Sequence, residues 1–140
     1  MNAPANGLSL RAERTGETRA AAMVKYLRNI VLRHGVWCEH FHAVFLDDQS
    51  RFLSDAGLGM GGQTALSLRM RELFGRALAV NASGLLIAHN HPSGDCKPSA
   101  HDIASTHRLI EIGKALDIEL VDHLIITQRS VYSMRAGGDL

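Results

Sequence analysis

A short apolar run that stops abruptly at a histidine-containing loop constrains this chain more than any other feature. Residues 84–88 read Gly-Leu-Leu-Ile-Ala, and such a run is typical of a strand covered on both faces. The polar segment 89–98 follows at once, and Ser99 then has the character of a helix N-cap, with Asp102 three residues further on. The sequence therefore predicts a buried strand, a polar loop and a helix to about residue 117, as in α/β proteins with a covered sheet.

Hydrophobic periodicity supplies the other elements of such a fold. Helical spacing of apolar residues predicts two more helices, over residues 18–34 and 70–80. Short aromatic, aliphatic or alternating segments predict four more strands, at residues 36–47, 51–56, 119–127 and 130–134. The fold class that we expect is α/β, a sandwich with a mixed central sheet.

Glycine and proline set the expected boundaries. Four glycines predict a flexible bend, at positions 57, 59, 61 and 62. Residues 65–68 are compatible with a short edge strand, and residues 1–16 read as a flexible tail. A length of 140 residues suits one domain, which we expect at residues 17–140.

Charge and cysteine content exclude several classes of protein. The formal net charge is only +1, but residues 1–37 hold six basic side chains against two acidic ones. These basic residues form either a solvated helix face or a contact with DNA; they are Arg11, Arg14, Arg19, Lys25, Arg28 and Arg33. Two cysteines make no disulfide framework and predict a cytoplasmic protein. No apolar run approaches the roughly 18 residues that a membrane span needs, and no signal peptide is evident.

The loop after the buried strand carries the candidate metal ligands. If the strand conformation persists, His89 and His91 point the same way, and Asp102 can supply a carboxylate from the next helix. Two histidines, one carboxylate and an open fourth position form a catalytic Zn²⁺ shell. Taken singly, His-x-His is a weak signal and Asp102 is more often a helix-capping residue. Their combination at a strand-to-helix junction favours a metal site.

The same letters resemble a known family. His-x-His, seven residues, Ser, two residues and Asp, found here at 89–102, is the metal motif of the JAB/MPN (JAMM) metallopeptidases. The fuller string His-Asn-His-Pro-Ser-Gly-Asp at 89–95 looks like the bacterial RadC branch. The segments 39–47 and 122–126 also resemble strands of that branch, so the similarity covers about residues 36–140.

The resemblance implies a cytidine-deaminase-like α/β fold (the JAB/MPN fold) and one Zn²⁺ per chain, bound by His89, His91 and Asp102. It also implies a catalytic glutamate on an early strand, a position that Glu39 matches. Glu39 would carry protons as general acid/base, and Ser99 would place a hydroxyl beside the developing oxyanion. The expected activity is Zn²⁺-dependent hydrolysis of a peptide or isopeptide bond, with a peptide or protein as substrate.

Two other functions deserve comparison. The chain could be a DNA-associated accessory protein of the RadC repair type, with a structural or vestigial metal site and a DNA contact through the basic segment. Longer RadC-like chains carry an N-terminal helix-hairpin-helix domain, for which we expect no room before the matching region. A zinc deaminase is disfavoured because the Pro-Cys-x-x-Cys ligand pair is missing. The sequence leaves open whether the protein forms a homodimer.

The remaining polar residues receive simpler interpretations. Cys96 is a weaker candidate ligand than Asp102, and Asp95 is expected to shape the loop or support a histidine. His123, in an apolar strand, is more often a hydrogen-bonded structural histidine than a ligand. His40 and His42 are expected at the surface or at the rim of the site.

Overall fold

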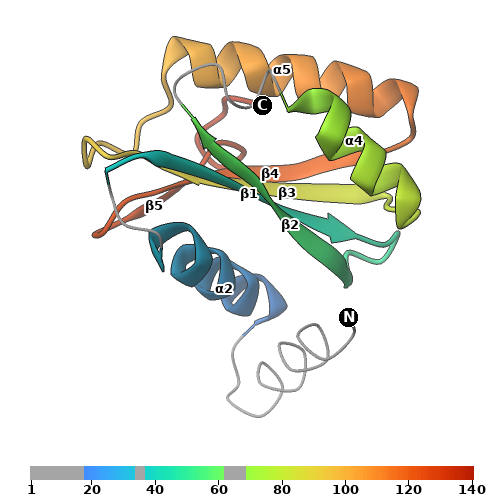
Figure 1. Cartoon of the computed structure of the whole chain (residues 1–140), viewed down its shortest axis with the longest axis horizontal. Helices are drawn as coiled ribbons and strands as arrows, with labels where there is room; N and C mark the ends of the chain where they lie inside the picture. The colour runs from blue at the N-terminus through green and yellow to red at the C-terminus, as the bar shows by residue number, and fades with distance from the viewer. Residues whose placement is uncertain (1–17, 34–36, 62–68) are drawn as a thin grey trace.

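The computed structural model describes residues 18–33, 37–61 and 69–140 (Figure 1). The predicted tail at 1–16 and the ambiguous segment 65–68 lie outside the described residues. No helix within the described part of the chain is both long and apolar enough to cross a membrane.

Five strands form one sheet in the order β2-β1-β3-β4-β5. Their bounds are β1 Glu39–Leu46, β2 Phe52–Gly61, β3 Gly84–Asn90, β4 Glu119–Ile126 and β5 Val131–Ser133. β3 and β4 run parallel, whereas the other neighbouring pairs are antiparallel, which confirms the predicted mixed sheet. β3 lies at the centre, and all of its residues are buried, as its apolar run predicts.

Helices cover both faces of the sheet, which confirms the α/β class. α2 (Arg19–Arg33) packs on one face, while α4 (Met70–Ala79) and α5 (Ala100–Ala115) lie on the other (Figure 1). Because side chains alternate along a strand, Leu85 and Ile87 of β3 join the core on the α4/α5 side. His89 continues this alternation, so its ring lies on the same face, below the first turn of α5.

The predicted glycine bend is wrong within the described residues, because β2 continues through positions 57 to 61. Two residues of β2 stand opposite one residue of β1 between the pairs His40–Met60 and His42–Gly57, which is a β-bulge. Gly59 has a φ of +87° in this bulge, a conformation that favours glycine. The glycines thus permit an irregular strand rather than end it.

Candidate metal centre

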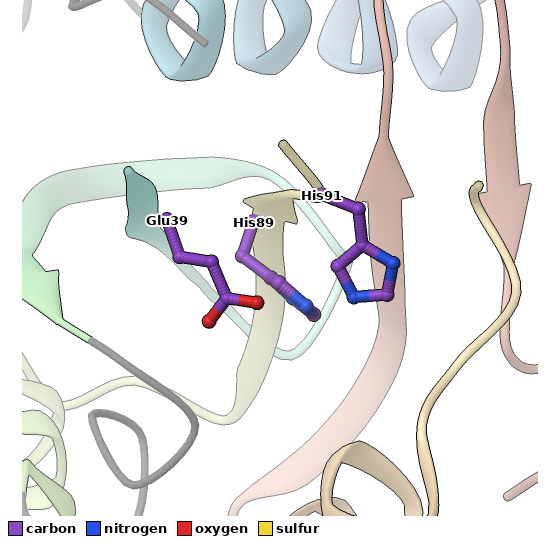
Figure 2. A group of neighbouring side chains, drawn as sticks. All are labelled: Glu39, His89 and His91. Carbon is purple, nitrogen blue, oxygen red and sulfur yellow. The ribbon is translucent and has the colours of Figure 1, made fainter. Parts of the chain in front are cut away.

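Strand pairing brings the candidate residues together at one end of the sheet. β1 runs antiparallel to β3, and Phe41 pairs with His89. Glu39, two residues earlier in β1, therefore lies beside the end of β3 where His91 follows. Figure 2 shows the side chains of Glu39, His89 and His91 gathered around one space.

Four of the predicted residues meet at this end of the sheet. Ligand atoms of Glu39, His89 and His91 all lie within 4.8 Å of one another. Asp102 adds its carboxylate from the first turn of α5, with Oδ2 3.0 Å from His91 Nε2 and Oδ1 3.4 Å from His89 Nε2. Two imidazole nitrogens and carboxylate oxygens are the donor set that Zn²⁺ commonly takes in catalytic sites.

One buried atom indicates where a cation fits. His89 Nε2 is buried and makes no hydrogen bond within the described part of the chain. Its contact with Asp102 Oδ1, at 3.4 Å, is in ion-pair range but is not a hydrogen bond. A buried polar atom without a partner is costly, and a metal ion between the ring nitrogen and the carboxylate would satisfy it. The residues present therefore fit a metal ion.

His91 is held by the loop that follows it. Its Nδ1 lies 2.7 Å from the backbone oxygen of Asp95, so this nitrogen must be the protonated donor. In the metal-free chain its Nε2 donates to Asp102 Oδ2 at 3.0 Å, and this hydrogen bond raises the pKa of His91. A bound metal would take the place of that proton. The Asp95 side chain accepts the backbone N–H of Lys97 at 3.0 Å, which agrees with the loop-shaping role predicted for it.

Asp102 and Ser99 form a complete capping box at the start of α5. The Ser99 hydroxyl accepts from the Asp102 N–H at 3.0 Å, and Asp102 Oδ2 accepts from the Ser99 N–H at 2.9 Å. Asp102 is thus a capping residue and a neighbour of both histidines at once. Burial acts to raise the pKa of Asp102, but His89 and His91 outweigh it and hold that pKa well below its usual range.

Glu39 sits in a different electrostatic environment. Its side chain is partly buried, and this desolvation raises its pKa, although His89 and His91 partly offset the effect. Asn90, the residue between the two histidines, forms hydrogen bonds with the backbone on both sides of Glu39. Its Oδ1 accepts from the His40 N–H at 2.7 Å, and its Nδ2 donates to the Cys38 carbonyl at 3.0 Å. Sequence reasoning missed this role of Asn90.

Two fully buried residues, His123 and Thr106, continue a hydrogen-bond chain from His89 on the side of its ring away from the Asp102 carboxylate. His89 Nδ1 lies 2.7 Å from His123 Nε2, and His123 Nδ1 lies 2.8 Å from Thr106 Oγ1. Burial lowers the pKa of His123 well below its usual range, so its ring is neutral at pH 7. His123 is hydrogen-bonded, as expected. Thr106 was missed, although its place four residues after Asp102, on the same helix face, was a usable signal.

The other polar candidates lie elsewhere. His42 pairs with Asp55 at 2.7 Å on the β1–β2 side of the sheet. Cys96 is a free thiol and does not belong to the Glu39, His89 and His91 cluster found in the described part of the chain.

The fold and the site together define an α/β protein with a JAB-type candidate metal centre at the end of its central strand. The chain belongs to the RadC family: residues 17–139 match the family described as the RadC-like JAB domain. This match begins about 19 residues before the region that the motifs predicted, and it takes in α2.

Curated relatives agree with this assignment. The chain is 42% identical over 100 residues to the UPF0758 protein of Paraburkholderia xenovorans, covering 71% of this chain and 40% of the relative. It is 40% identical over 102 residues to the UPF0758 protein of Halalkalibacterium halodurans, covering 73% and 44%. It is 39% identical over 100 residues to that of Syntrophomonas wolfei, covering 71% and 43%. The chain thus spans less than half the length of these relatives.

Proposed function

We propose that this chain is a Zn²⁺-dependent hydrolase of amide bonds, in peptides or isopeptides. The observation that carries the proposal is the position of a carboxylate with a raised pKa, Glu39, within 4.8 Å of two histidines at the end of a buried strand. Membership in the JAB family, which includes hydrolases, supports it.

Different pKa values suggest different roles for the two carboxylates. Asp102 has a strongly lowered pKa and stays anionic, which suits a metal ligand beside His89 and His91. Glu39 has a pKa that burial raises above its usual value, which suits a group that takes up and releases a proton. We therefore assign the metal to His89, His91 and Asp102, and proton transfer to Glu39.

Amide hydrolysis needs a nucleophilic water, a proton carrier and support for the oxyanion. Zn²⁺, when bound, supplies the first by lowering the pKa of a coordinated water to about 7. Glu39 takes the proton at a carboxylate oxygen and delivers it to the leaving amine. The Ser99 hydroxyl accepts from the Asp102 N–H and therefore still has its own proton to donate to the substrate oxygen.

A small pocket beside His91 offers a place for the substrate. It has a volume of about 150 Å³ and opens between the loop after β3 and the end of β4. Its wall includes Asn90, His91, Pro92, Ile126 and Arg129. We propose that one substrate side chain binds there, next to the metal centre.

The test is a hydrolysis assay on a peptide library and on Gly–Lys isopeptides, read by mass spectrometry with the full chain and added Zn²⁺. We expect Glu39→Gln to remove cleavage while zinc binding remains. The exposed Glu111 provides a matched control, and Glu111→Gln should cleave like the parent. Full cleavage by Glu39→Gln would overturn the assignment of Glu39.

A further inference from the structure

Three fully buried polar side chains form a continuous row behind the candidate metal centre. His89 of β3, His123 of β4 and Thr106 of α5 each have 0% exposure. Burying polar groups is unfavourable unless each finds a hydrogen-bond partner, so the direction of every bond in this row is constrained.

Thr106 has only one hydroxyl proton to donate. Its Oγ1 lies 2.6 Å from the backbone oxygen of Asp102, a group that can only accept, so the proton points there. The other nearby acceptor, the sulfur of Met134, is 3.8 Å away. With its proton used, Thr106 Oγ1 must accept in its 2.8 Å contact with His123 Nδ1. His123 is therefore protonated on Nδ1.

The position of the proton on His123 also fixes the position of the proton on His89. A neutral imidazole carries one proton, so His123 Nε2 has a lone pair and accepts. Its partner at 2.7 Å, His89 Nδ1, must then be the donor. His89 thus has its proton on Nδ1. Its buried Nε2, which has no hydrogen-bond partner among the described residues, is the atom free to bind a cation.

We propose that Thr106 and His123 form a hydrogen-bond relay that fixes His89 as the Nδ1–H tautomer and thereby aims its Nε2 lone pair at the metal. Thr106 and His123 are positioning residues, since neither belongs to the group of side chains that could hold the metal among the described residues. The part that concerns metal affinity rests on the proposed metal centre. The part that concerns the tautomer of His89 does not depend on it.

His91 is an internal control for the effect of Thr106 on His89. His91 donates from Nδ1 to the backbone oxygen of Asp95 at 2.7 Å, and a carbonyl can only accept. The proton on His91 Nδ1 is therefore independent of Thr106. A change at Thr106 should alter the ring of His89 and leave the ring of His91 unchanged.

Two substitutions at Thr106 separate the hydroxyl from the shape of the side chain. Thr106→Val removes the acceptor, so His123 can move its proton to Nε2 and donate to His89, which then protonates on its metal-facing nitrogen. Thr106→Ser keeps the hydroxyl. We expect Zn²⁺ affinity to fall about 10–100-fold in Thr106→Val and to stay close to the parent value in Thr106→Ser.

The experiment combines ring-nitrogen NMR of the full, ¹⁵N-labelled chain, metal-free and with Zn²⁺, with affinity measured by competition against a chromophoric chelator. We expect a proton on His89 Nδ1 in the parent and in Thr106→Ser, its loss in metal-free Thr106→Val, and an unchanged His91. The spectrum of the parent alone can refute the relay, because an unprotonated His89 Nδ1 in that spectrum overturns it. Equal spectra and affinities for the parent and Thr106→Val also overturn it. If the tautomer pattern holds but the parent binds no Zn²⁺, the relay stands and the proposed function fails.

Discussion

Replacing Asp102 by asparagine separates the two tasks that this residue performs. The amide oxygen of Asn can still accept the Ser99 N–H, so the cap of α5 should largely persist. The charge beside His91, 3.0 Å away, is lost. A hydrogen bond to a charged group contributes about 1.5–3 kcal/mol, and we expect the metal-free variant to lose about this amount of its unfolding free energy.

Zinc should enlarge that difference. Loss of an anionic ligand should weaken binding at least as much as loss of a supporting residue, for which a hundredfold effect is the upper end. A hundredfold weaker affinity removes about 2.7 kcal/mol of ligand-induced stabilisation when Zn²⁺ is in excess. The variant should therefore fall further below the parent in Zn²⁺ than in chelator.

Urea unfolding at pH 7, with chelator and with excess Zn²⁺, measures both quantities on the same protein. Asp48→Asn, at an exposed turn, is the matched control and should gain as much from Zn²⁺ as the parent. If Asp102→Asn keeps the full zinc-dependent gain while Glu39→Gln loses it, Asp102 is not a metal ligand. In that case Glu39, His89 and His91 would be the ligands, as their separation within 4.8 Å permits.

Three further predictions concern the rest of the molecule. A Cβ on Gly113 would lie 2.3 Å from a backbone oxygen, whereas Gly75 has nothing within 4 Å. In urea unfolding, Gly113→Ala should therefore lose about 1–3 kcal/mol, and Gly75→Ala should gain about 0.5–1 kcal/mol. Burial, and then the hydrogen bond to Asp55, raises the pKa of Tyr26 to about 12. The contribution of Tyr26 to the stability of the fold is therefore complete below the pKa of an unfolded tyrosine, about 10. The urea midpoint of the parent should fall between pH 10 and 12, and Tyr26→Phe should lack the part of this fall that Tyr26 causes. Equal falls of the urea midpoint in the two proteins would refute this role of Tyr26. If the basic N-terminal segment contacts DNA, a salt-dependent gel shift should vanish on deletion of residues 1–20, and no shift at low salt would count against it.

The arrangement of the candidate ligands could largely be predicted from the sequence, because it depends on local geometry. His89 and His91 are two residues apart at the end of an apolar run, and Asp102 lies in the first turn of the next helix. The alternatives for Asp102 proved compatible, since it is both a capping residue and a neighbour of the histidines.

The long-range partners could not be predicted in this way. Glu39 reaches the site because β1 pairs with β3 in one particular register, and only the family resemblance pointed to it. Asn90 acts through contacts with the chain at the start of β1, which periodicity does not encode. The helical spacing of Thr106 from Asp102 indicates its face of α5 but not its contact with His123 of β4. The bend predicted near Gly59 was wrong because strand pairing with β1 outweighs the local preference of glycine.

Elemental analysis of the purified chain tests the central claim most directly. After incubation with Zn²⁺ and removal of the excess, we expect about one zinc per chain in the parent and none in the His89→Ala/His91→Ala double variant. Cys96→Ser should keep its zinc, which would exclude binding through this free thiol. The absence of zinc from the parent, or its retention by the double variant, would contradict the metal centre and the hydrolase mechanism built on it.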